Sequence, residues 1–110
     1  MTPPTTPPPD APDDPRAPIA PQTLAAALPE WTVETGAASR TVQAPSFPAA
    51  VELVRTVADS AEELGHHPDM TISYRTVTFT CTTHDAGGAL TGLDLMLARA
   101  IDQAVAAALS

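Results

Sequence analysis

Apolar residues recur along this chain with two spacings, which predict helices and strands in turn. Residues 21–28, 47–64 and 93–109 place apolar side chains three or four positions apart, as amphipathic helices do. Residues 31–34, 40–44, 70–74 and 76–83 alternate apolar with polar side chains, as half-buried strands do. The order is a short helix followed by two strand-strand-helix units. It predicts an α+β two-layer sandwich, in which a four-stranded antiparallel sheet carries the helices on one face.

The central helix has clear boundary signals. Ser46 is a favourable N-cap, Pro48 is tolerated in the first turn, and Gly65 is expected to end the helix. The predicted apolar face follows steps of four and three residues and comprises Phe47, Val51, Val54, Ala58 and Ala61, widened by Leu53, Val57 and Leu64.

The last two strands are expected to form a hairpin, with Arg75–Thr76 as its tight connection, although neither residue is typical of such turns. Thr91 then caps the last helix, and Asp94 three residues later completes a pair that resembles a capping box. Leu95 and Met96 lie beside the main apolar stripe of this helix, which favours a homodimer or homotetramer for so small a domain.

Proline dominates the start of the chain. Nine of the 13 prolines lie within the first 21 residues, and few apolar side chains separate them. Proline donates no backbone hydrogen bond and restricts φ, so we expect residues 1–20 to form a disordered tail and residues 21–110 a single domain. The tail lacks the basic and apolar segments of a signal peptide.

Charge and cysteine content narrow the possible partners and location. The net charge of −8 argues against binding to nucleic acid phosphates, and no apolar stretch is long enough to cross a membrane. The single cysteine, Cys81, lies at an apolar position of a predicted strand, so we interpret it as a small core residue. These features favour a cytoplasmic protein.

The candidate chemistry lies in the three histidines. His66 and His67 enter the third strand and His84 follows the fourth, so a hairpin would gather them at one end of the sheet, where Asp94 begins the last helix. Three interpretations are open: surface histidines with Asp94 as a helix cap, a zinc or iron site, and acid–base chemistry without metal. Adjacent histidines rarely bind one ion, and the spacing of the three is not that of common metal sites.

A longer pattern resembles a known family. The chain reads Glu62-x-x-x-His66-His67-Pro68-Asp69, then Tyr74, Thr83-His84-Asp85-x-Gly87-Gly88, Leu90-Thr91-x-x-Asp94 and Ala100-Ile101-Asp102. Together with Trp31 and the helix start at Phe47, this pattern resembles the pterin-4a-carbinolamine dehydratases from about Leu24 onward.

The resemblance implies the fold predicted above and an enzyme that dehydrates 4a-hydroxytetrahydrobiopterin to quinonoid dihydrobiopterin during tetrahydrobiopterin recycling, with neither metal nor organic cofactor. It assigns catalysis to His66, His67 and His84. It assigns pterin binding to Glu62, Pro68, Asp69, Met70 and Asp94. A protonated imidazole can help the 4a-hydroxyl leave as water, and a neutral one can accept the proton of the neighbouring ring nitrogen.

Two positions depart from the family pattern. Met70 stands where many relatives carry an aromatic residue, and Ala89 resembles an insertion between Gly88 and Leu90. Some relatives are binding proteins, including a dimerisation cofactor of a transcription factor. The alternative is therefore a non-catalytic partner-binding or assembly module on the same fold, although the three histidines favour the enzyme.

Overall fold

The structure is a computed structural model, and its described residues are 17–83 and 89–109. They form three helices and four strands in the predicted order, which confirms the α+β class. The elements are α1 (Pro21–Ala27), β1 (Thr32–Glu34), β2 (Ala37–Gln43), α2 (Phe47–Leu64), β3 (Asp69–Ser73), β4 (Thr76–Cys81) and α3 (Gly92–Leu109).

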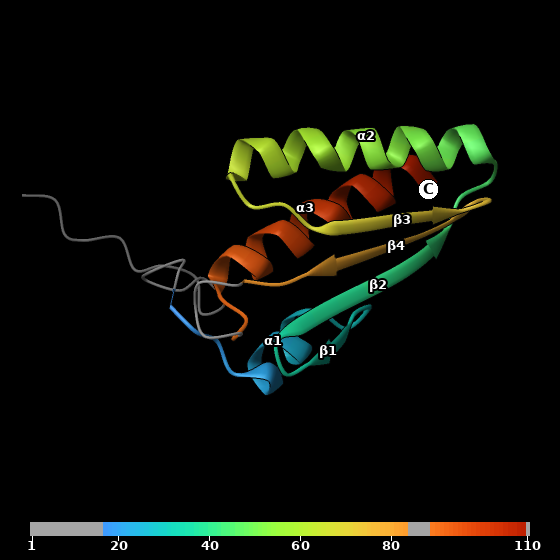
Figure 1. Ribbon diagram of the computed structural model, residues 1–110. Coiled ribbons are helices and arrows are strands. Elements are labelled where there is room, and N and C mark those ends of the chain that lie inside the picture. The colour runs from blue at the N-terminus through green and yellow to red at the C-terminus, as the bar shows by residue number, and fades with distance from the viewer. Residues whose placement is uncertain (1–16, 84–88, 110) are drawn as a thin grey trace, which may run out of the picture.

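The four strands make one antiparallel sheet in the order β1-β2-β4-β3, and α2 and α3 lie side by side over one of its faces (Figure 1). The alternation of β4 explains the two layers. Val77, Phe79 and Cys81 are fully buried under the helices, whereas the threonines between them lie on the opposite face and are partly exposed. The central strand therefore fixes which face of the sheet the helices cover.

The turn between β3 and β4 differs from the prediction. Ser73 pairs with Thr76, so the two-residue connection is Tyr74–Arg75, one position earlier than Arg75–Thr76. Tyr74 has a φ of 57°, the left-handed region that tight hairpins require but that a bulky side chain disfavours. No glycine or asparagine marks this turn, so the sequence did not predict which two residues connect the strands.

The buried face of α2 agrees with the prediction only in part. Its buried residues are Ala50, Leu53, Val57 and Ala61, whereas Phe47 and Val51 are 56% and 42% exposed. The apolar face predicted from the sequence included these two large side chains. Leu53, Val57 and Ala61 were predicted on this face, and Ala50 is the buried residue that the prediction lacked.

A polar network joins the first half of the chain to α3. The indole Nε1 of Trp31 donates to Asp102 Oδ1 at 2.8 Å, and the guanidinium of Arg40 forms an ion pair with the same oxygen at 2.6 Å. Arg40 and Asp102 are largely shielded, so their charges interact more strongly than an exposed pair would. The family pattern included Trp31 and Asp102, and their contact ties β1 and β2 to α3.

The predicted tail falls mostly on residues 1–16, outside the described residues. Pro18 and Ile19, also placed in that tail, already contact the domain: Pro18 pairs with Thr91, and the Ile19 N–H donates to Leu90 O at 2.7 Å. None of the described helices has the length and apolar character needed to cross a membrane.

Cys81 is a buried core residue, as predicted. Burial raises the pKa of its thiol well above the ordinary value of 9.0, and the carboxylates of Asp94 and Asp102 raise it further. We therefore expect the folded protein to resist alkylation by iodoacetamide at pH 8, and to react once urea unfolds it. Mass spectrometry measures both, and rapid alkylation of the native protein would contradict this assignment.

The same pKa shift predicts the direction of a stability change. Above pH about 9 the thiol ionises in the unfolded chain but not in the folded one, so the free energy of unfolding falls by at most about 1.4 kcal/mol per pH unit. Below that pH the contribution is fully present. The variant Cys81→Val is the matched control and should lack this alkaline decline.

Candidate functional site

The end of α2 positions the first histidine. Gly65 has a φ of 65°, and the chain leaves the helix in a Schellman motif: the Gly65 N–H bonds Glu62 O and the His66 N–H bonds Ala61 O, each at 3.2 Å. The backbone of His66 is thus held by α2 itself. The glycine that ends the helix also determines where this histidine begins its loop.

Gly65→Ala tests this arrangement. No atom lies within 4 Å of the position that an added Cβ would take, so the expected cost is conformational rather than steric. We expect the free energy of unfolding to fall by about 1 kcal/mol, because alanine disfavours the left-handed region. Gly65→Asn should cost less. Urea denaturation measures both, and an unchanged stability of Gly65→Ala would contradict the assigned turn.

The side chain of His66 is paired with a buried carboxylate. Its Nε2 lies 2.9 Å from Asp94 Oδ1, and Asp94 is 1% exposed. An ionised carboxylate only accepts hydrogen bonds, so Nε2 then carries the hydrogen of this bond and the other ring nitrogen, Nδ1, is left for a further hydrogen-bond partner. The hairpin thus brings His66 and Asp94 together, as the topology predicted.

Asp94 is also part of a hydroxyl network. Its Oδ2 accepts the Thr91 N–H at 2.9 Å and the Thr83 hydroxyl at 2.5 Å, and the two threonine hydroxyls lie 3.1 Å apart. The Thr91 hydroxyl in turn accepts the Leu93 N–H at 3.2 Å, which confirms the predicted N-terminal cap of α3. Asp94 therefore serves two purposes, since one oxygen holds the start of α3 and the other holds His66.

Thr83 is the residue whose contribution the sequence analysis missed. It appeared in the family pattern without a role, yet it is buried and its hydroxyl lies within hydrogen-bonding distance of Asp94, Thr91 and, at 3.5 Å, His66. The sequence contained a pattern from which this contribution could have been predicted. Thr83 continues the inward positions of Val77, Phe79 and Cys81, and a hydroxyl at an inward position needs a partner.

His67 occupies a different environment. Its Nε2 lies 2.8 Å from Glu62 Oε2, and the two side chains are 65% and 79% exposed. Glu62 is on the last turn of α2, so the helix presents a carboxylate to His67 while α3 presents another to His66. Adjacent histidines thus bind separate carboxylates, one in contact with solvent and one buried.

The remaining predicted site residues are placed less uniformly. Met70 is partly buried and packs against the core, whereas Asp69 alternates to the opposite side of β3 and is exposed. Within the described part of the chain, neither Pro68 nor Asp69 forms a side-chain hydrogen bond with a histidine. His84 and most of the loop before Ala89 lie outside the described residues.

No group of three possible metal-ligating His, Cys, Asp or Glu side chains occurs in residues 17–83 and 89–109. The electrostatic character of the described site comes instead from two histidine–carboxylate pairs at the junction of α2, β4 and α3.

Comparison with known proteins identifies the family. The model of the family described as "Pterin 4 alpha carbinolamine dehydratase" matches residues 17–104. This chain belongs to the pterin-4a-carbinolamine dehydratase family. A relative from Nocardia farcinica, named "Putative pterin-4-alpha-carbinolamine dehydratase", is 62% identical over 76 residues, or 69% of this chain and 79% of its own. A relative of the same name from Roseiflexus castenholzii is 49% identical over 75 residues, or 68% and 80% of the two chains.

A solved structure of similar fold is named "transcriptional coactivator/pterin dehydratase" and comes from Brucella melitensis. It superposes with a TM-score of 0.70 at 28% identity, covering 76% of this chain and 89% of its own. Membership of the pterin-4a-carbinolamine dehydratase family supports dehydratase activity acting on a pterin, and it confirms the resemblance identified from the sequence.

Proposed function

We propose that this protein dehydrates 4a-hydroxytetrahydrobiopterin to quinonoid dihydrobiopterin by histidine acid–base catalysis, within tetrahydrobiopterin recycling. The observation that carries the proposal is the geometry of the two adjacent histidines. Each binds its own carboxylate at one end of a fold that belongs to this family. The reaction breaks the C–OH bond at position 4a and removes the proton of the neighbouring ring nitrogen. It needs an acid for the leaving hydroxyl and a base for that proton.

His67 and His84 are the proposed acid–base pair. His67 is largely exposed, so a substrate can reach it, and Glu62 orients its imidazole through the 2.8 Å contact. His84 directly follows Thr83 in the chain, and Thr83 binds Asp94. We assign no fixed order, because either imidazole can begin as the acid.

His66 is the proposed binding and orienting histidine. Its side chain is 13% exposed, and its Nε2 is already paired with Asp94. Because of this pairing, we assign His66 to positioning the pterin rather than to exchanging protons with it. We propose that Asp94 acts through His66, since its own side chain is almost wholly inaccessible. Glu62, Pro68, Asp69 and Met70 remain the proposed pterin-binding residues around this pair.

Dehydration without a metal is part of the proposal. The support is that the described histidines direct their Nε2 atoms at different carboxylates rather than at one point. A direct assay tests function and metal dependence together: chelator-treated protein is mixed with a 4a-hydroxytetrahydropterin, and formation of the quinonoid product is followed by absorbance. We expect acceleration over the uncatalysed reaction. Activity that chelation abolishes and zinc restores would overturn the metal-free mechanism.

The second candidate function is a partner-binding or assembly module. The observation that favours it is the Brucella melitensis structure, whose name combines coactivator with pterin dehydratase. The same assay separates the two, because a pure binding module does not accelerate product formation.

We further propose a homodimer or homotetramer in the cytoplasm. The support is apolar surface on the helices: Phe47 and Val51 on α2 and Met96 on α3 are all more than two-fifths exposed. Sedimentation at micromolar concentration tests the oligomer, and a monomer there would contradict it.

A further inference from the structure

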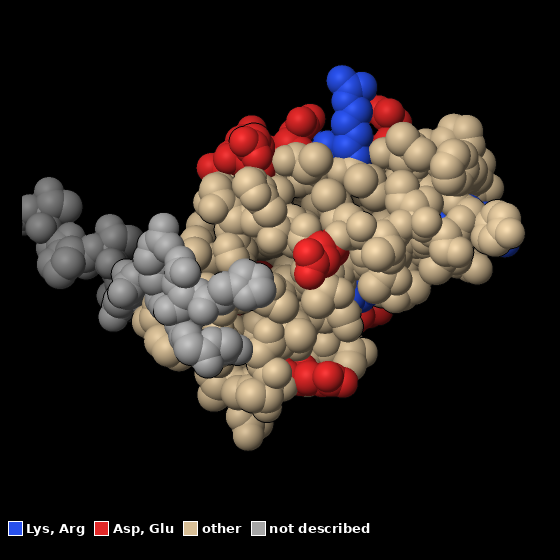
Figure 2. Space-filling model, viewed as in Figure 1, with Lys and Arg blue, Asp and Glu red and all other residues tan. Residues whose placement is uncertain are grey.

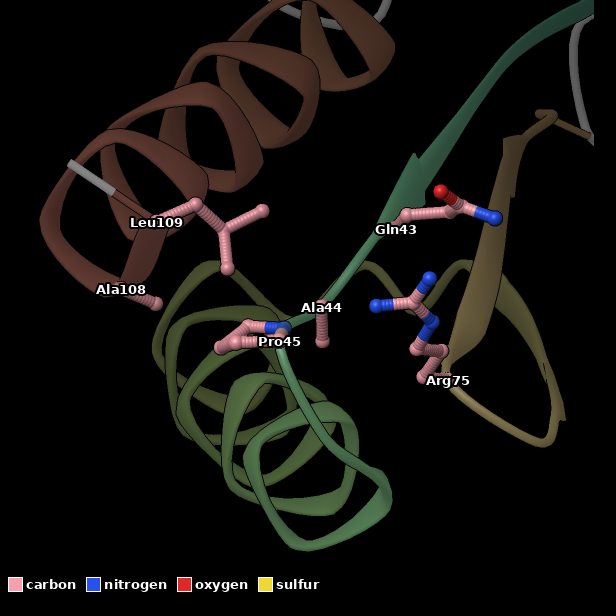
Figure 3. Close-up of a pocket in the computed structure, with 6 residues that line it drawn as sticks. All are labelled: Gln43, Ala44, Pro45, Arg75, Ala108 and Leu109. Carbon is pink, nitrogen blue, oxygen red and sulfur yellow. The ribbon is translucent and has the colours of Figure 1, made fainter.

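A second concave site lies at the end of the molecule opposite the histidines. It is a cavity of about 410 Å³ that lies beside the β3–β4 turn, the entry to α2 and the end of α3 (Figure 3). Its lining residues are Gln43, Ala44, Pro45, Arg75, Ala108 and Leu109. β3 and β4 run the length of the sheet between the two sites, a separation of roughly 17 Å for five residues of strand.

Arg75 supplies the positive charge of this cavity. Its backbone is anchored, since its carbonyl accepts the Ala44 N–H at 2.8 Å, and its side chain extends from the turn toward Ala44 (Figure 3). Among the described residues the guanidinium has neither an ion pair nor a hydrogen bond. Arg40 and Arg55, by contrast, lie beside Asp102 and Glu52. Arg75 is therefore available to an anion from outside.

The described segments around Arg75 carry no acidic side chain. The three segments that form this end, residues 43–47, 73–76 and 106–109, include no aspartate or glutamate, although the chain has a net charge of −8. Figure 2 shows the same pattern on the visible face, where acidic side chains gather over the other parts of the molecule and none lies on this end. An approaching anion thus meets no acidic side chain from these three segments.

The backbone conformation of Tyr74 is a second, independent indication that this turn has a function. A bulky side chain at a φ of 57° costs free energy, of order 1–3 kcal/mol, and its ring is 87% exposed, so burial within the chain does not offset that cost. Backbone strain that packing does not explain is a reason to look for function at the strained residue. Tyr74 directly precedes Arg75 in this turn, although the lining residues of the cavity do not include it.

The lining limits the ligand. Ala44, Pro45, Ala108 and Leu109 are the apolar lining residues, and the polar groups are the Arg75 guanidinium and the Gln43 amide. Arginine binds a carboxylate through two parallel hydrogen bonds. The carbonyl end of α3 adds partial negative charge nearby, which disfavours a doubly charged phosphate more than a single carboxylate.

We propose that this cavity binds a carboxylate attached to an apolar group, with Arg75 and Gln43 holding the carboxylate and with the apolar group packed against Pro45 and Leu109. Such a group occurs on small apolar acids and at the C-terminus of peptides that end in an apolar residue. The site is separate from the histidine site and does not depend on dehydration.

A nuclear magnetic resonance titration tests the proposal with N-acetylleucine as probe and N-acetylleucinamide as its uncharged match. We expect the acid to shift the amide signals of Gln43, Ala44 and Leu109 with a Kd of about 1 mM, a weak affinity suited to a ligand of this size. Arg75→Gln should weaken binding at least tenfold, as should the amide probe. Arg55→Gln removes another exposed arginine, on α2, and should change nothing.

Two further measurements extend this test. If the peptide Ala-Ala-Ala-Leu binds at least tenfold more tightly than N-acetylleucine, the physiological source is a peptide C-terminus, and equal affinity assigns a small acid. Tyr74→Gly should raise the midpoint of thermal unfolding, because glycine relieves the strain. The absence of shifts at this cavity, or equal binding by the wild type and Arg75→Gln, would overturn the proposal.

Discussion

Replacing either His67 or His84 by alanine is expected to lower turnover of a 4a-hydroxytetrahydropterin by about 100-fold or more, the usual scale for loss of an acid or base. The physical reason is that each imidazole either supplies or removes one of the two protons that the dehydration moves. His67 is exposed and bound to Glu62, so its loss removes no core packing and should leave the fold intact. Thermal unfolding of each variant verifies that the loss is chemical.

His66→Ala provides the comparison for this experiment. His66 is held by Asp94 and largely shielded, so its replacement should raise KM and reduce turnover less than the other two variants do. Glu62→Gln keeps the shape of the partner of His67 but weakens the contact, and it should reduce turnover only modestly because both groups are solvated. A His66→Ala loss larger than the His67→Ala loss would reverse the proposed roles.

Replacing Asp94 by asparagine is expected to have the second-largest effect, on both stability and activity. The carboxylate accepts from Thr83, Thr91 and His66 in a buried position, whereas an amide has one acceptor and brings donors of its own. We expect the free energy of unfolding to fall by about 2–3 kcal/mol. Turnover per folded molecule should fall by about 10–100-fold, because His66 loses its orienting partner.

Variants of Thr83 separate the effect on stability from the effect on activity. Thr83→Val keeps the side-chain shape and deletes the hydroxyl that Asp94 accepts, and Thr83→Ser keeps the hydroxyl. If the network positions His66, turnover should fall in the valine variant and largely recover in the serine variant. Denaturant unfolding and turnover are measured on the same samples. Unchanged turnover per folded molecule in both Asp94→Asn and Thr83→Val would reduce Asp94 to a helix cap.

The boundaries of the long helices were predictable because local chemistry marks them. Ser46 accepts the Ala49 N–H at 3.2 Å and Gly65 takes the left-handed conformation, as the sequence indicated for α2. Thr91 and Asp94 form the predicted cap of α3. Each signal depends on residues only a few positions apart, so no knowledge of the tertiary structure was needed.

Features that depend on contacts across the fold were not predictable in the same way. The turn at Tyr74 lacks the residues that usually mark a left-handed position. On α2, the burial of Ala50 and the exposure of Phe47 and Val51 depend on how the helix packs against the rest of the fold. The contact of Thr83 with Asp94 joins residues from β4 and α3. The approach of His66 to Asp94 was predictable from topology, but the separate carboxylate partners of His66 and His67 emerged only in the structure.

The most direct test of the account is a comparison of turnover among the wild type, His67→Ala and His84→Ala, with a 4a-hydroxytetrahydropterin as substrate and each protein shown to be folded. We expect the wild type to accelerate formation of the quinonoid product and each variant to lose about 100-fold or more of that turnover. Normal turnover in both variants, or no acceleration by the wild type, would contradict histidine acid–base catalysis. The second of these results would leave the partner-binding module as the better interpretation.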